Sequence, residues 1–221
     1  MKRRKKRFSV ISARVKPISS RVKVKNFDKK LFTLTMFFCI GLLFSAVFFS
    51  KSSNFFSAFS LRYLKQNYTI FTTSSFLQCF LCKIRIGFLL LCIVYFLGLF
   101  LLGTSLVCLV PALYGFFIGI LGSFLYAKAS VQGVWYYGIA FVLPSIFSVS
   151  TLLVSCKESI FMSHDLTHAF LYGQENVKGK KQLKLYTIRY SIFFIGYVLS
   201  ALVFSVCSIL FKGKFHLNFL F

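Results

Sequence analysis

Two histidines and an aspartate come closest to a catalytic or metal-binding set in this chain. His164, Asp165 and His168 stand in the string HDLTH, so the histidines lie four residues apart on one face of a helix. That spacing suits zinc, but the zinc-peptidase pattern also needs a glutamate beside the first histidine, and Asp165 is one carbon shorter. A third ligand would have to come from Glu158 or Glu175. We favour the alternative that both histidines are solvated or lie at a membrane interface.

A second pair of reactive residues is the lone C-x-x-C of Cys79 and Cys82. No second pair accompanies it, so a zinc site lacks ligands, whereas a redox pair on the outer face stays open as an alternative. The other five cysteines lie in apolar segments, where a thiol behaves as a small hydrophobic group. With only four acidic residues there is little material for acid–base catalysis. We therefore predict no catalytic site, no metal site and no cofactor, and we expect that the chain is not an enzyme.

The elements that carry these residues are expected to be membrane-spanning helices. Residues 86–127 form an uncharged apolar run of 42 residues, about twice the length that one helix needs to cross a bilayer. The chain is 57% hydrophobic and only 14% charged, where a soluble domain carries about 25% charged residues. Because no polar loop interrupts the run, its turn must lie at Gly-Thr-Ser 103–105 or at Val-Pro 110–111.

The sequence predicts an all-α, polytopic membrane helical bundle with about five transmembrane helices. Isolated strands would leave backbone groups unpaired in lipid, so helices are the only form available. Residues 31–221 are treated as one membrane domain, whose predicted spans are 31–50, 86–106, 111–127, 134–156 and 190–211. Outside the spans, we expect an amphipathic helix on the outer leaflet within 51–85 and a surface helix within 157–189 that ends at Gly173.

The first 30 residues form a strongly basic tail, with 13 Lys and Arg against a single acid, Asp28. Such a segment repels itself and is predicted to be disordered. Nucleic-acid binding is one interpretation, but a span follows directly, so we favour contact with anionic lipid and a role in setting topology, and we expect no nucleic-acid partner. The apolar run after it is expected to be an uncleaved first span. The residues assigned to anionic-lipid contact are Lys2, Arg3, Arg4, Lys5, Lys6 and Arg7.

The distribution of basic residues predicts a cytoplasmic N-terminus and an external C-terminus. This orientation places 19 Lys and Arg on the cytoplasmic side and 8 outside. No predicted span contains an ionisable residue, because Lys128, Lys157 and Arg189 lie at span ends, where they can reach the headgroups. That pattern argues against proton coupling or ion transport.

Small residues and prolines mark the predicted spans. Gly115, Gly119 and Gly122 recur at i, i+4 and i+7, so they share a face of the third span, and Gly98 and Gly103 flank the end of the second. Such glycines allow close helix approach, either in a partner-binding groove or in packing among spans two, three and four, which we favour.

Pro111 and Pro144 should kink or start helices, and in a transporter such a break can mark a substrate site. Without polar residues around them, we favour a structural role. Contact with a partner on the outer face is assigned, as a hypothesis, to the aromatic residues Phe55, Phe56, Phe59 and Tyr63.

Residues 97–158 resemble the stage II sporulation protein M family. The resemblance consists of an apolar run ending in Leu-Gly-Thr-Ser, Pro111, a Gly-rich third span and a fourth span with the step Leu143-Pro144. It implies a non-enzymatic scaffold in the membrane of a spore-forming bacterium. Members of that family are expected to anchor the peptidoglycan-degrading stage II sporulation proteins D and P during engulfment of the forespore.

Two other functions remain as alternatives. The chain could be the membrane subunit of a transporter partnered by a separate ATPase, and residues 157–175 are then the one candidate for a cytoplasmic coupling helix. It could also be a membrane-embedded enzyme that uses His164 and His168. Membrane lipids are expected partners in every case, and the oligomeric state is left open.

Overall fold

A computed structural model describes residues 20–51, 53–101, 103–172 and 177–211. These residues are almost entirely helical and contain no strand, so the predicted all-α bundle is confirmed. Five helical segments are long and apolar enough to cross a membrane. They are Lys29–Phe49, Phe76–Leu99, Gly103–Lys128, Val131–Phe170 and Gln182–Phe211.

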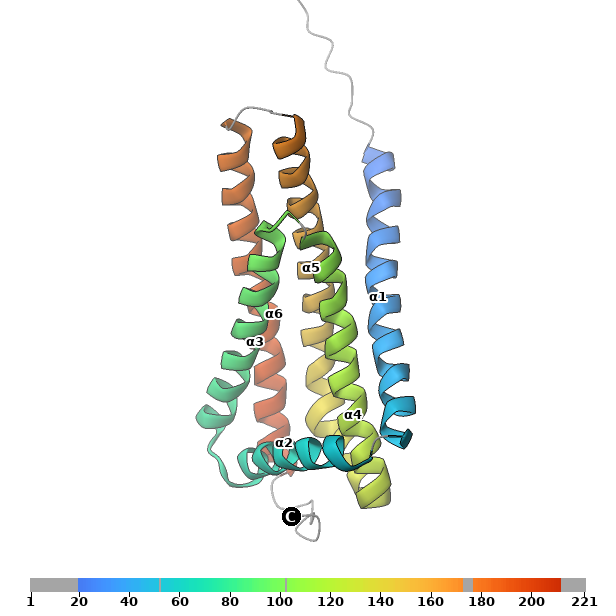
Figure 1. Ribbon diagram of the computed structural model, residues 1–221. Coiled ribbons are helices and arrows are strands. Elements are labelled where there is room, and N and C mark those ends of the chain that lie inside the picture. Colours follow the sequence, from blue (N-terminus) through green and yellow to red (C-terminus); the bar gives the residue numbers. More distant parts are fainter. Residues whose placement is uncertain (1–19, 52, 102, 173–176, 212–221) are drawn as a thin grey trace, which may run out of the picture.

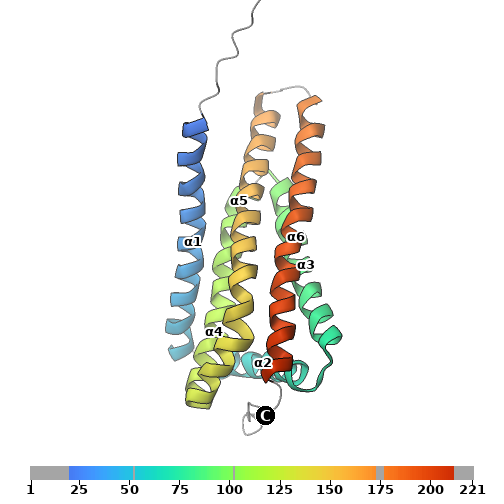
Figure 2. The same cartoon turned by 180° about the vertical axis from the view of Figure 1, so that it is seen from behind.

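The helices form an upright bundle with one helix across its end (Figure 1). Helices α1, α3, α4, α5 and α6 run side by side, whereas α2 lies crosswise at the end where α6 finishes, as both views show (Figures 1 and 2). The elements are α1 (Ser20–Lys51), α2 (Ser53–Thr73), α3 (Phe76–Leu99), α4 (Gly103–Tyr137), the π-helix η1 (Gly138–Val142), α5 (Leu143–Tyr172) and α6 (Val177–Phe211).

Several predicted boundaries are wrong because the helices continue past the apolar runs. Helix α1 already begins at Ser20, so residues 20–30 are helical rather than disordered. A helix nucleated in a span propagates outward at little cost, which explains the extension. Similarly, α3 begins at Phe76, ten residues before the predicted start, and includes Lys83 and Arg85. The predicted helix within 51–85 does exist as α2.

The predicted surface helix within 157–189 is not a separate element. Helix α5 runs without interruption from Leu143 to Tyr172, and α6 begins at Val177 rather than at residue 190. The end of α5 lies one residue before Gly173, which agrees with the predicted stop. Together α5 and α6 project beyond the turn between α3 and α4 (Figure 1).

The apolar hairpin turns between Leu99 and Gly103. The Gly-Thr-Ser alternative is therefore nearly right, and the Val-Pro alternative is wrong because Pro111 lies inside α4. Three carbonyl–hydroxyl hydrogen bonds hold the turn against α5: Ser163 Oγ donates to Phe100 O (2.8 Å) and to Leu101 O (3.4 Å), and Thr167 Oγ1 donates to Leu101 O (3.1 Å). These hydroxyls satisfy carbonyls that the turn leaves without helical partners.

The chain reverses again within the helical stretch from Gly103 to Tyr137. The hydroxyl of Tyr137 donates a 2.8 Å hydrogen bond to the carbonyl of Ile118. Nineteen residues of straight helix would separate these groups by about 28 Å, so the chain must fold back between them. The reversal lies between Lys128 and Val131, where one spanning segment ends and the next begins.

Candidate functional site

The predicted histidine set does not assemble into a closed metal site. His164, Asp165 and His168 are exposed near the C-terminal end of α5. The two imidazole rings lie 6.4 Å apart, and His164 Nδ1 is 4.0 Å from Asp165 Oδ1. Among the described residues, no three His, Cys, Asp or Glu side chains are arranged to hold a metal ion. The geometry offers two ligands on one helix face, where a structural zinc site needs four.

The two cysteines of the C-x-x-C motif lie in different environments. Cys79 is fully buried, and its thiol donates to the carbonyl of Ile70 at 3.3 Å and lies 3.5 Å from the hydroxyl of Ser208. Cys82 is half-buried, and neither cysteine forms a disulfide. Cys79 therefore ties α3 to α2 and α6, which gives it a structural role.

Three glycines form a close contact between α1 and α4, here called the glycine seam: Gly41 of α1 with Gly115 and Gly119 of α4. A Cβ atom on Gly115 would overlap the carbonyl oxygen of Phe38, and one on Gly119 would overlap the hydroxyl of Ser45. A Cβ on Gly41 would overlap a backbone carbonyl of α4. The packing interpretation thus describes Gly115 and Gly119, but their partner is α1 and not the neighbouring spans that the sequence suggested.

The other predicted glycines also serve packing within the chain. Added Cβ atoms would overlap the ring of Tyr137 at Gly122 and the hydroxyl of Tyr186 at Gly98. At Gly103 the obstacle is the carbonyl of the preceding helix, so this glycine permits the tight turn between α3 and α4. None of these three positions is an open groove.

A buried cluster of hydroxyl groups, which the sequence analysis missed, joins α3, α5 and α6. Ser159 Oγ donates to the carbonyl of Val94 at 3.0 Å and lies 3.1 Å from the hydroxyl of Tyr186. It also hydrogen-bonds Tyr190, whose hydroxyl donates to the carbonyl of Ser155 at 3.0 Å. In a membrane such groups must find internal partners, so the cluster fixes how the three helices meet.

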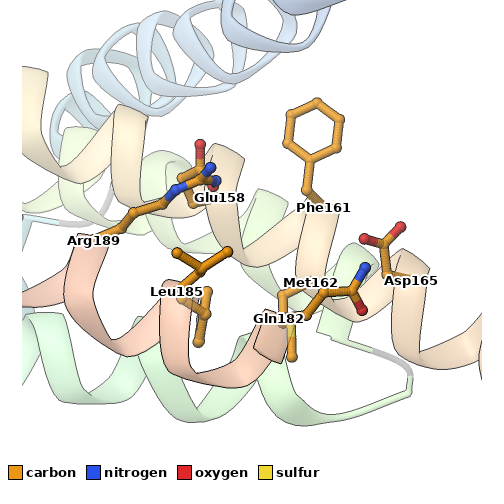
Figure 3. A pocket seen from close by; sticks show the side chains of 8 residues that line it. Glu158, Phe161, Met162, Asp165, Gln182, Leu185 and Arg189 are labelled. Atoms are coloured by element: carbon orange, nitrogen blue, oxygen red, sulfur yellow. The ribbon is translucent and has the colours of Figure 1, made fainter. Parts of the chain in front are cut away.

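A small pocket of about 190 Å³ lies between α5 and α6 (Figure 3). Arg189 Nη1 donates to Glu158 Oε2 at 2.5 Å, and Figure 3 shows the two side chains meeting at one end of the pocket. Asp165 and Gln182 line the other part, and Asp165 is 53% exposed. The ion pair neutralises Glu158 and joins the two helices, and a solvated aspartate beside it makes no nucleophile–base pair.

Ionisable residues do lie within the spans, contrary to the prediction. Lys83 and Arg85 belong to α3, and the side chain of Lys157 is fully buried in α5. The prediction missed Lys83 and Arg85 because it started the span at the apolar run, whereas α3 begins ten residues earlier and includes both basic residues. An ionisable group inside a span is expensive and usually marks a functional site.

Lys83 lies beside a cavity of about 390 Å³, here called the lateral cavity, among α3, α4, α5 and α6. Its walls are mostly apolar, with a few polar groups that include the hydroxyls of Tyr114 and Ser148, which lie 3.0 Å apart. Tyr63 of α2 also lines the cavity, and burial raises the pKa of its hydroxyl. This volume and lining are typical of a small-molecule site.

Pro144 is the second residue of α5, which agrees with the prediction that this proline kinks or starts a helix. The π-helix η1 ends at Val142, two residues before Pro144, and Ala140, Phe141 and Pro144 all line the lateral cavity. Widened π turns occur frequently at functional sites. Pro111, by contrast, is a buried residue inside α4.

Helix α2 packs on the bundle through one face. Leu64 and Phe71 are fully buried, and Phe71 contacts the rings of Tyr136 and Phe204 with centroid distances of 5.5 and 5.8 Å. Its other face carries exposed residues, namely Leu61, Arg62, Lys65, Gln66 and Thr69.

Among the residues predicted to contact an outer-face partner or anionic lipid, Tyr63 is the one whose side chain belongs to the described part of the chain. Tyr63 is half-buried at the lateral cavity, so it is not a free outward contact. The side chains of Phe55, Phe56 and Phe59 lie outside the described part of the chain, although their backbone belongs to α2. The basic residues from Lys2 to Arg7 also lie outside it.

No known protein family matches the chain, and no curated protein or solved structure is significantly similar to it.

Proposed function

We propose that the chain is a membrane scaffold of the stage II sporulation protein M type, which anchors and localises peptidoglycan-degrading enzymes during engulfment of the forespore. The observation that carries the proposal is helix α2, which lies across one end of the bundle and not along it (Figure 1). The pattern of glycine and proline in residues 97–158 supports it as a resemblance.

Helix α2 has the properties of a docking platform at the membrane surface. It is amphipathic, with Leu64 and Phe71 buried against the bundle and Arg62 and Lys65 exposed. Its position is fixed by hydrogen bonds as well as by apolar contacts, because Ser208 Oγ of α6 donates to the carbonyl of Phe71 at 2.7 Å. A helix held this way presents side chains to a partner without an entropic cost for ordering them.

The orientation that we propose puts α2 outside the cell, facing the wall. The start of α1 and the paired ends of α5 and α6 lie at the opposite end of the bundle (Figures 1 and 2). Lys and Arg are concentrated in the segments at that opposite end, which is the side that stays in the cytoplasm. The partner enzymes would then meet α2 on the side where peptidoglycan lies.

The experiment is an affinity purification from membranes of sporulating cells with a tag on the N-terminus. We expect the wild type to recover a peptidoglycan hydrolase. The double variant Arg62→Glu/Lys65→Glu should recover at least tenfold less hydrolase, because its two new carboxylates would repel an acidic surface on the partner. Lys128→Glu is the control, since Lys128 is an exposed lysine at the end of the spanning segment Gly103–Lys128 and lies outside α2. Equal recovery by all three proteins would refute α2 as the platform.

The lateral cavity favours one second function, the membrane subunit of a transporter. It supplies the polar lining around Pro144 that the sequence alone did not show. Residues 157–172, which belong to the candidate segment for a coupling helix, continue α5 and do not form a separate helix. Recovery of an ATP-hydrolysing subunit without a peptidoglycan hydrolase would favour the transporter function over the scaffold function.

A further inference from the structure

We propose that the lateral cavity holds one acyl chain of an anionic phospholipid from the leaflet on the α2 side, with the lipid phosphate bound by Lys83. This inference does not depend on the scaffold function.

The cavity opens sideways toward the lipid. Helix α3 diverges from α4 toward the α2 end in both views (Figures 1 and 2). Three apolar residues at this opening, Ile86 and Leu89 of α3 and Phe117 of α4, line the cavity and are also exposed on the outer surface. An acyl chain therefore has an apolar path from the bilayer into the bundle, and no water-filled route is needed.

Lys83 supplies the charge that selects the headgroup. Its Nζ atom lies 4.2 Å from the ring centroid of Phe204 and donates to Asn67 Oδ1 at 3.4 Å. No carboxylate in the described part of the chain forms an ion pair with it. A lysine held in a span without an acidic partner calls for an anion from outside the chain.

The depth of Lys83 fits a lipid phosphate. It lies seven residues from the start of α3 at Phe76, which corresponds to about 10 Å along the helix from the α2 layer. A lysine side chain can span much of that distance toward the headgroups. The charge is therefore at the polar boundary, while the cavity continues deeper into the hydrocarbon region.

The deeper wall contains a polar group that awaits a partner. Tyr197 of α6 lines the cavity and is only 4% exposed, and its hydroxyl has no hydrogen-bond partner among the described residues. Burying an unpaired hydroxyl costs free energy, and the ester oxygen of a lipid could accept its hydrogen bond. A phospholipid matches the three features together: an anionic head, ester oxygens below it and an apolar tail.

The test is native mass spectrometry of the purified full-length chain, delipidated and then titrated with phosphatidylglycerol or with phosphatidylcholine of the same acyl chains. We expect the wild type to bind phosphatidylglycerol about tenfold more tightly, since a charge-assisted contact is worth about that factor. Lys83→Gln should lose this preference. Arg85→Gln should keep it, because Arg85 is an exposed basic residue of the same helix that does not line the cavity.

Three outcomes would overturn the proposal. They are equal binding of the two lipids by the wild type, an unchanged preference in Lys83→Gln, and displacement of the lipid by millimolar inorganic phosphate, which would indicate a site for a free anion.

A second measurement does not depend on a variant that folds. Phosphatidylglycerol with a diazirine at the end of one acyl chain is photolysed with the wild-type chain, and the labelled residues are mapped. Label on cavity-lining positions such as Leu90, Tyr114 and Ile120 supports the proposal. Label confined to outward positions such as Ile93 and Phe96 refutes it, because these residues face the bulk lipid.

Discussion

At the scale of single residues, the glycine seam leaves no room for a side chain between α1 and α4. Gly115 faces a backbone carbonyl of α1, which cannot rotate away as a side chain can. We expect Gly115→Ala to destabilise the docking of α1 by about 1–3 kcal/mol through overpacking. Denaturant titration in mild detergent measures this. Gly138→Ala is the control, because a Cβ there meets nothing within 4 Å, and it should be neutral or slightly stabilising. Equal effects of both substitutions would argue against a tight seam.

The hydroxyl cluster gives a second prediction about a single atom. Ser159→Ala removes one oxygen and leaves the carbonyl of Val94 and two tyrosine hydroxyls with fewer partners. The expected loss of stability is about 1–3 kcal/mol, measured by thermal unfolding in the same detergent. Ser150→Ala on the same helix should change stability by less than about 0.5 kcal/mol, because Ser150 is exposed and bonds only its own helix. If the hydroxyl cluster does not stabilise the fold, Ser159→Ala and Ser150→Ala should change the stability by the same small amount.

At the scale of elements, α2 depends on one aromatic anchor. Phe71→Ala leaves a hole between Tyr136 and Phe204 and should cost about 3–5 kcal/mol. We expect α2 to open locally while the spans persist, so hydrogen exchange should rise in residues 60–71 and not in α4 or α5. Leu61→Ala is the control on the exposed face of the same helix. Uniformly raised exchange throughout the bundle would show that α2 is not a separate unit.

The helices themselves were largely predictable from the sequence, since apolarity and length decide what can cross a bilayer. The 42-residue run correctly predicted a hairpin with its turn near Gly103. The start of α3 was missed because Lys83 and Arg85 interrupt the apolar pattern, although the helix continues through both residues.

The site was predictable only in fragments, because it depends on which helices meet. The glycines of α4 indicated close packing, but nothing local identifies α1 as the partner, since Gly41 lies more than 70 residues away in sequence. The hydroxyl cluster joins Ser159 to residues about 30 positions later in α6. The spacing of Ser155, Ser159 and Ser163 on one helix face was visible, but Ser155 was assigned to the fourth span and the other two serines to a separate surface helix.

At the scale of the whole molecule, the proposed orientation makes a direct prediction. In a chain without other cysteines, Gln66→Cys on α2 should react with a membrane-impermeant maleimide on intact protoplasts. Lys184→Cys at the opposite end should react only after permeabilisation. Both positions are exposed, so reactivity reports the side of the membrane and not burial. The reverse pattern would invert the topology and remove α2 from the wall side.

The most direct measurement of the scaffold function is the position of a peptidoglycan hydrolase in living cells. The hydrolase recovered with the chain is tagged with a fluorescent protein and imaged during engulfment in cells that lack the chain, complemented by the wild type, by Arg62→Glu/Lys65→Glu or by Lys128→Glu. The account predicts a focused signal at the engulfing membrane with the wild type and Lys128→Glu, and a dispersed signal with the α2 variant or without the chain. A hydrolase that stays focused in cells without the chain would contradict the account.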